Sequence, residues 1–329
     1  MSVALTFVVF VLSISIGIYH VPFFDVIRII ASKYIPSLNI EPNWPIQSEV
    51  AVNSIRLPRA IAALIIGGGL AAAGAAYQSM FKNPMVSPDI LGVSSGASVG
   101  AALAIFFSAK IIWIELGAFI GGVAAVMITM TVPRIIKNDS VIILVLAGII
   151  VGSMASALMS IIRMMADPAT TLADITYWTM GSLTRAKMSE LALIVPVMLA
   201  CLILLLLMRY RLNVMSLGEN EAKMLGINIS RQRTVVIVLS TLLTACSVSV
   251  AGTVGWVGLV IPHITRMITG PDNKKMLPVA LFLGGIFMMA MDMLARSLSV
   301  MEIPLSVLTG LIGSPIFFVV LLKQRKSLL

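Results

Sequence analysis

Two arginines that flank a proline near the start of a long apolar run could bind carboxylates. They belong to the segment Arg56-Leu57-Pro58-Arg59, in which the proline suits the first turn of a helix. A guanidinium group can bind a carboxylate through two parallel hydrogen bonds, so the pair could receive acidic side chains of a partner. Arginines at the end of a membrane span extend equally well toward lipid headgroups, and spacing alone does not separate the two roles.

A third candidate is Arg296, which follows Asp292 by four residues. Side chains at this spacing share one face of a helix, so the two are expected to form an internal ion pair. Asp292 and Glu115 are the acidic residues that come closest to a span interior, where proton-driven carriers usually keep one. Both lie near the end of a span, so a secondary carrier driven through Asp292 is a disfavoured alternative.

The longest polar insertion, at about residues 209–233, contains a short amphipathic segment between two glycines. Its apolar residues offer contacts while its acidic residues keep it hydrated, which is typical of a helix that docks in the groove of a partner. A helix lying on lipid is disfavoured, because the acidic residues would face anionic headgroups. The residues of this docking segment are Leu217, Gly218, Glu219, Glu221, Ala222, Leu225 and Gly226.

Other reactive patterns are weak or missing. Gly92 to Gly96 spells G-x-S-x-G, but a nucleophile elbow needs a preceding strand, so an intramembrane hydrolase using Ser94 or Ser95 is a distant alternative. His263 and the two cysteines lack the spacing of metal ligands, so neither a metal nor another cofactor is expected. The sequence contains no G-x-x-x-x-G-K-[ST] loop, so any ATP and its Mg²⁺ must be bound by another subunit.

These residues must be positioned by helices that cross a membrane. The chain has 329 residues, of which 59% are hydrophobic and 11% charged, whereas a soluble domain carries about a quarter charged residues. Its mean hydropathy is +1.05. Each crossing needs about 20 mainly apolar residues, and the run 234–265 is long enough for two helices with a glycine bend between them.

The sequence therefore predicts an all-α polytopic membrane protein with about ten transmembrane helices in one domain, residues 1–329. Residues 19–55 are expected to form an interfacial loop, because aromatic and proline residues suit that boundary. The dense small residues of the second span let neighbouring backbones approach closely, so this helix is expected to be central. The predicted spans are 3–18, 60–80, 92–108, 116–132, 140–162, 191–208, 234–265 as two helices, 276–291 and 303–322.

The distribution of charge predicts the topology. With the N-terminus and C-terminus both cytoplasmic, the connections on the inner side carry the whole formal net charge of +9. This is the asymmetry that the positive-inside rule describes, so the basic residues indicate orientation in a membrane and no nucleic-acid partner.

Taken in order along the chain, four segments resemble the iron-chelate and vitamin B12 (FecCD-type) permease family of binding-protein-dependent type II ABC importers. They are the Arg56-Leu57-Pro58-Arg59 start, the turn from Asn83-Pro84 to Gly96, the glycine-bounded helix of residues 218–226, and Pro262-His263 with Arg266. The stretch from Ala295-Arg296 to Pro315 continues the same order. The resemblance covers nearly the whole chain.

The resemblance implies the type II importer permease fold, in a homodimer or a pseudo-symmetric heterodimer of such subunits. Two ATPase subunits would bind ATP and Mg²⁺, and a soluble or lipid-anchored substrate-binding protein would dock on the other side. By the same resemblance, Arg56, Arg59 and Arg296 would receive glutamates of the binding protein. The segment from Gly218 to Gly226 would be the helix that couples to the ATPase.

The implied function is import of a ferric siderophore or a similar metal chelate across a bacterial or archaeal plasma (inner) membrane. Haem, vitamin B12 and molybdate are alternative cargoes, because no residue of the sequence decides among them. The permease itself would catalyse no covalent reaction.

Overall fold

The computed structural model describes residues 2–138, 140–299 and 301–328. Every regular element in these ranges is a helix. In the first half of the chain they are α1 (Ser2–Ser15), α2 (Phe23–Tyr34), η1 (Pro36–Leu38), α3 (Ile46–Val50), η2 (Ala51–Arg56), α4 (Leu57–Met80), η3 (Pro88–Leu91), α5 (Val93–Phe106), α6 (Ile111–Ile136) and α7 (Val141–Met165). The second half contains α8 (Thr171–Met180), α9 (Met188–Leu207), α10 (Arg209–Leu217), α11 (Glu219–Met224), α12 (Ile229–Ala251), α13 (Val257–Thr269), α14 (Asn273–Ser297) and α15 (Leu305–Leu328).

Each predicted span coincides with a helix. Within the described residues, 6 helices are long and apolar enough to cross a membrane. They are α6, α7, α9, α12, α14 and the continuous helix Ile46–Met80 that joins α3, η2 and α4. Shorter apolar helices occupy the remaining predicted spans, as α1, α5, α13 and α15. The chain is therefore a multi-pass membrane protein.

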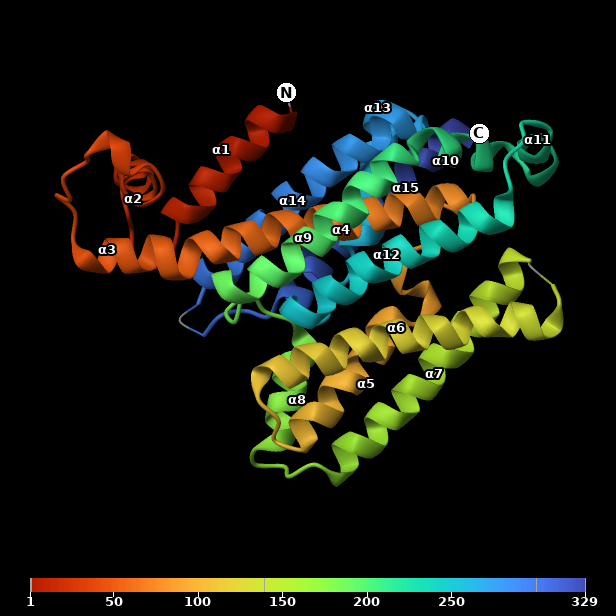
Figure 1. Cartoon of the computed structure of the whole chain (residues 1–329), viewed down its shortest axis with the longest axis horizontal. Coiled ribbons are helices and arrows are strands. Elements are labelled where there is room, and N and C mark those ends of the chain that lie inside the picture. The colour runs from red at the N-terminus through yellow and green to blue at the C-terminus, as the bar shows by residue number, and fades with distance from the viewer. Residues whose placement is uncertain (1, 139, 300, 329) are drawn as a thin grey trace.

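Helix α4 lies at the centre of the protein, as its small residues predict (Figure 1). In the most apolar 18-residue stretch of the helix Ile46–Met80, 83% of the residues are buried inside the protein. The corresponding share is 28% for each of α6, α7 and α9. A Cβ added at Gly67 would collide with the carbonyl oxygen of Gly284 in α14, and one at Gly74 would collide with Gly258 in α13. Glycine at these positions therefore permits the close approach of three helix backbones.

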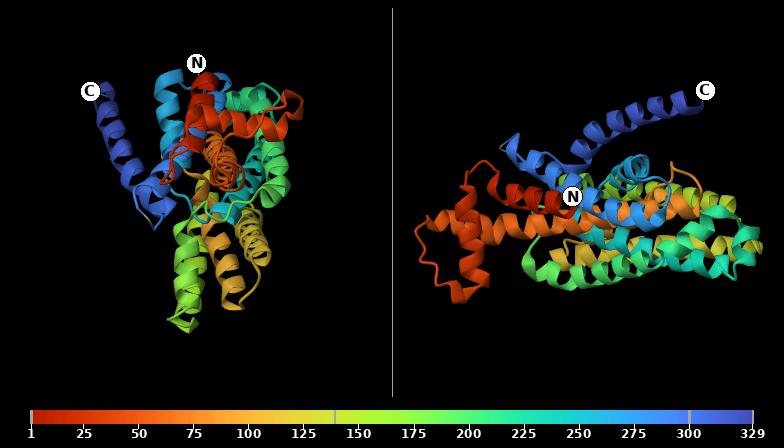
Figure 2. Two further views of the ribbon diagram at one scale, coloured as in Figure 1. Left: turned by 90° about the vertical axis from the view of Figure 1, so that its left-hand side faces the viewer. Right: turned by 90° about the horizontal axis from the view of Figure 1, so that it is seen from above.

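A second group of helices lies beside this core. In Figures 1 and 2, α5, α6, α7 and α8 extend to one side of α4 and α12 as a yellow and light-green group. Helices α5 and α6 approach closely because Gly96 of α5 faces Gly121 of α6, and Gly100 faces Gly117.

Three parts of the structure differ from the prediction. Residues 19–55 were expected to form a loop but contain α2, α3 and η2, because Val26 and Ile29 give α2 an apolar face that packs into a small core. Residues 209–233 contain α10 and the first turn of α12 in addition to the short helix. Helix α8 was not predicted, and it is held by burial of Ile175 and Trp178.

Candidate functional site

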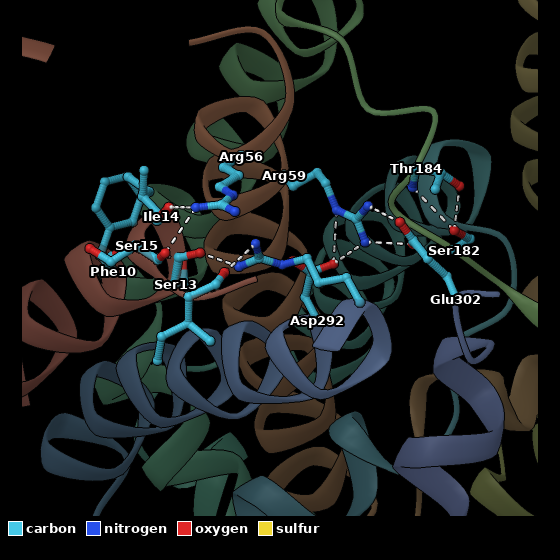
Figure 3. A network of polar contacts seen from close by, with 12 residues as sticks. Phe10, Ser13, Ile14, Ser15, Arg56, Arg59, Ser182, Thr184, Asp292 and Glu302 are labelled. Carbon is cyan, nitrogen blue, oxygen red and sulfur yellow. Dashed lines mark hydrogen bonds and ion pairs between the residues drawn. The ribbon is translucent and has the colours of Figure 1, made fainter. Parts of the chain in front are cut away.

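The first predicted site residue, Arg59, is bound to two carboxylates of the same chain (Figure 3). Its Nη2 lies 2.8 Å from Oδ1 of Asp292, and its Nε lies 3.1 Å from the same oxygen. Its Nη1 and Nη2 donate to the two carboxylate oxygens of Glu302 at 2.6 and 2.8 Å. Arg59 therefore joins α4 to α14 and to the loop before α15.

The other two arginines bind the C-terminal end of α1. Arg56 donates to the carbonyl oxygens of Ile14 and Ser15 at 3.0 and 2.9 Å. Arg296 donates to the carbonyl of Ser13 and also forms the predicted pair with Asp292, with Nε 3.2 Å from Oδ2. The last carbonyls of a helix have no partner within the helix, and the helix dipole makes that end negative. The two guanidinium groups thus supply both the hydrogen bonds and the positive charge that α1 needs.

Burial limits what these arginines can contact. Arg56, Arg59 and Arg296 are 5%, 3% and 8% exposed, respectively. The three guanidinium groups belong to one network that connects α1, α4 and α14. Figure 3 shows Arg56, Arg59 and Asp292 within it. Their docking to glutamates of a binding protein stays a prediction.

The predicted docking helix is present as α11, between Gly218 and Gly226. Gly226 has a φ of +74°, which is the left-handed conformation that glycine adopts without strain. Ala222 is fully buried in a small core with Val214 and Ile229. The side chain of Glu219 lies outside the described part of the structure.

Apolar side chains on and beside α11 point away from the protein. Leu217 is 62% exposed, Met224 is 86% exposed and Leu225 is 58% exposed. Helices α10 and α11 lie at one end of the molecule, and α3 with the start of α4 lies at the other (Figure 1). The arginine network and α11 are therefore separated by the length of α4. The coupling role of residues 217–226 stays a prediction.

A polar junction that the sequence analysis missed attaches this end to the core. The Asn213 side chain of α10 donates to the Asp272 carboxylate at 2.6 Å and accepts the Asn273 backbone N–H at 2.7 Å. Ser79 of α4 donates to the side-chain oxygen of Asn273 at 2.7 Å. The hydrogen bond from Asn213, the Lys274 backbone N–H and the neighbouring lysines hold the pKa of Asp272 below its ordinary value. No local sequence signal marks this junction, because its members lie on three separate helices.

A hydroxyl-lined hollow of about 320 Å³ opens between α5, α7 and α8. It is lined by Ser95, Ser98, Ser156, Ser160, Thr179 and Arg163, among others. Arg163 donates to the Thr179 hydroxyl at 3.3 Å and forms no ion pair with a carboxylate within the described residues. Such a lining favours a hydrated anion over lipid. The sequence signal for this hollow is the repeat of Ser156 and Ser160 along one face of α7, with Arg163 at the same helical spacing.

The residues of the weaker motifs show no arrangement of catalytic groups around them in the described part of the structure. Ser94 donates to the Asp89 carboxylate, and the turn before it is the 3₁₀ helix η3 where a nucleophile elbow would have a strand. His263 is buried against Phe317, with ring centroids 5.6 Å apart. Cys201 and Cys246 are buried as free thiols. His263 and the two cysteines pack as core side chains.

Comparisons with known proteins agree over nearly the whole chain. Residues 5–323 match the family described as the FecCD transport family. The molybdate import system permease protein MolB of Haemophilus influenzae is 37% identical over 317 residues, covering 96% of this chain and 93% of that protein. The cobalamin import system permease protein BtuC of Halobacterium salinarum is 34% identical over 298 residues, covering 88% and 80%. A solved metal-chelate type ABC transporter in an inward-facing conformation superposes with a TM-score of 0.87 at 35% identity, covering 98% and 97%.

Proposed function

Since the chain belongs to the FecCD transport family and is a permease subunit of an ABC importer, we propose that it forms the membrane passage for a metal chelate. A ferric siderophore is the primary cargo of this proposal, and haem, vitamin B12 and molybdate are the alternatives. Molybdate has added support, because MolB is named as a molybdate permease and matches along 96% of this chain.

The ATP-driven part of the proposal rests on the exposed apolar side chains at α11. The six-residue helix α11 exposes Met224, and Leu225 directly after it is exposed as well. Exposed apolar side chains next to charged ones are typical of helices that dock in the groove of a partner. The partner is one of two ATPase subunits, each of which binds ATP and Mg²⁺. In this proposal the ATPase subunits bind the nucleotide and hydrolyse it, and the permease itself catalyses no covalent reaction.

In this proposal, movement of the ATPase subunits is transmitted to the passage through the hydrogen bonds that join α10 to α4 and α14. Because Asn213 is bonded to Asp272 and Asn273, and Asn273 to Ser79, a displacement of α10 and α11 acts on the ends of both α4 and α14. The permease is then the two-state element of the transporter. ATP biases that equilibrium only as far as the ATPases bind differently to the two states of the permease.

The hydroxyl-lined hollow supports an anionic cargo. Many ferric chelates and molybdate carry negative charge, and Arg163 supplies the one cation among the residues that line the hollow. Serine and threonine hydroxyls exchange hydrogen bonds with a hydrated solute without binding it tightly, as a passage requires.

The assembly of this proposal contains a second permease subunit, with a homodimer favoured, and a soluble or lipid-anchored binding protein on the outer face. It lies in the plasma (inner) membrane of a bacterium or archaeon, with both termini cytoplasmic. The asymmetry of basic residues in the sequence supports this orientation.

The test is reconstitution of the chain in liposomes with the ATPase and binding protein encoded beside it. ATP hydrolysis and uptake are measured with ferric siderophores, haem, cobalamin and molybdate in turn. Stimulation by one loaded binding protein would establish the importer and its cargo. Failure of the ATPase to associate, together with uptake that collapses with an uncoupler, would instead support the proton-driven carrier.

A further inference from the structure

An apolar groove with two carboxylates lies between α6 and α9. Its volume is about 220 Å³. Both helices pack against α12, and Cys246 and Ser249 of α12 contribute to the lining. The other lining residues are Ile112, Glu115, Leu116, Phe119, Glu190, Leu193, Ile194 and Val197.

The groove opens on a surface that faces lipid. Leu193 of α9 is 69% exposed, Leu116 of α6 is 42% exposed and Val197 is 42% exposed. These side chains belong to two of the helices long enough to cross a membrane. Next to a bilayer such a groove fills with hydrocarbon, because an empty one would forfeit the dispersion contacts of its lining atoms.

Glu115 is one of the two carboxylates that line the groove. The residue is only 7% exposed, and it makes no hydrogen bond or ion pair within the part of the chain that the structure describes. A carboxylate in apolar surroundings gains from a cationic partner, so the groove favours a ligand that carries a cation with N–H donors. Glu190 accepts one long hydrogen bond, from the Lys187 backbone N–H at 3.4 Å, and retains room for further donors.

Basic groups stand beside the two carboxylates. Arg185 and Lys187 lie near enough to act electrostatically on Glu115. Nη2 of Arg185 is buried without a hydrogen-bond partner in the described structure. The groove itself thus presents two carboxylates as acceptors for a cation, with basic groups near one of them.

We propose that this groove binds phosphatidylethanolamine. One acyl chain lies along Leu116, Phe119, Ile194 and Val197, and the primary ammonium donates to Glu115 and Glu190. The ammonium has three N–H donors, as a lysine side chain has. Phosphatidylcholine has the same net charge without an N–H donor on its quaternary nitrogen, and phosphatidylglycerol has no ammonium.

The test uses the full-length chain in nanodiscs made from equal parts of phosphatidylethanolamine, phosphatidylcholine and phosphatidylglycerol. The protein is released into detergent, and the lipids that stay bound are identified by native mass spectrometry. We expect about a tenfold preference for phosphatidylethanolamine over phosphatidylcholine, since hydrogen bonds to charged groups are among the stronger ones. The double variant Glu115→Gln with Glu190→Gln should abolish that preference, whereas Glu49→Gln, at an exposed glutamate of α3, should leave it unchanged.

A second variant distinguishes the contribution of the acyl chain to binding from that of the headgroup. Leu193→Trp narrows the groove and leaves both carboxylates in place, so it should lower retention of all three lipids. Thermal unfolding in detergent checks that each variant is folded. Equal retention of phosphatidylethanolamine and phosphatidylcholine by the unaltered chain would overturn the proposal, as would a preference that survives the double glutamine variant.

Discussion

Asp292 of α14 lies between two arginines, with Oδ1 2.8 Å from Nη2 of Arg59 and Oδ2 3.2 Å from Nε of Arg296. The Arg59 pair spans 233 residues of sequence, whereas the Arg296 pair spans one helical turn. All three side chains are buried. Asp292 therefore holds together the ends of α4 and α14, and its partner Arg296 also binds the end of α1.

Replacing Asp292 with asparagine should destabilise the protein strongly. The substitution leaves two buried guanidinium groups short of a counter-charge, and breaking a buried pair from one side costs about 3–5 kcal/mol. Chemical denaturation in detergent measures the change in the free energy of unfolding. Asp174→Asn, at an exposed position of α8, is the matched control and should change the free energy little. A loss below about 1 kcal/mol, the range of exposed ion pairs, would contradict the structural role of Asp292.

Glu302 should oppose docking of the binding protein, if the arginines dock it as predicted. A glutamate of the binding protein that binds Arg59 has to compete with Glu302, which already occupies Nη1 and Nη2. Glu302→Gln should therefore raise the affinity for the binding protein about three- to tenfold, and Arg59→Ala should lower it. Surface plasmon resonance on nanodisc-embedded transporter measures both. Unchanged affinity for the binding protein in both variants would show that Arg59 is not part of the docking surface.

Charge reversal on α11 should uncouple transport from ATP hydrolysis. The double variant Glu219→Lys with Glu221→Lys changes the charge of the predicted docking helix by four units, which places like charges against any basic groove of the ATPase. We expect at least a tenfold loss of ATP-dependent uptake, with the permease still folded. Glu41→Lys, at an exposed position before α3, controls for added positive charge. Uptake that survives the double change would show that the coupling assignment is wrong.

Arg163 should determine which cargo charge the passage accepts. Arg163→Glu places a negative charge in the hydroxyl-lined hollow and should reduce uptake of an anionic cargo about tenfold or more. Arg163→Lys keeps the positive charge and should retain most of the transport. Initial uptake rates into liposomes, measured at saturating loaded binding protein, distinguish the two variants. Equal uptake rates for the Arg163→Glu and Arg163→Lys variants would show that this hollow is not part of the passage.

Much of the architecture was predicted correctly from local sequence. Lipid demands long apolar helices, so the ten predicted spans could be located from hydropathy, and α4 could be placed centrally from its small residues. The Asp292–Arg296 pair could also be predicted, because an interval of four residues puts two side chains on one helix face. The resemblance of ordered short segments indicated the family, which the match over residues 5–323 confirmed.

The main errors of the prediction concerned helices that lie outside the spans. The stretch 19–55 was interpreted as a loop because its prolines and charges exclude a membrane crossing, yet α2 forms there around the buried side chains of Val26 and Ile29. Helix α8 was missed because its ten residues carry only a short apolar pattern. Such helices are stable through tertiary packing, and their own sequence gives a weak signal.

The sequence by itself determined the membrane class, the positions of the spans and the identity of the charged residues for which docking is predicted. Only the tertiary structure decided the partners of those residues. Arg59 meets Glu302 across 243 residues, Arg56 meets the end of α1, and Glu115 and Glu190 come together from separate helices. Hydropathy and helical periodicity act over neighbouring residues and can be read along the chain. The partner of a charged side chain is set by which helices pack together, and that is fixed only when the whole bundle forms.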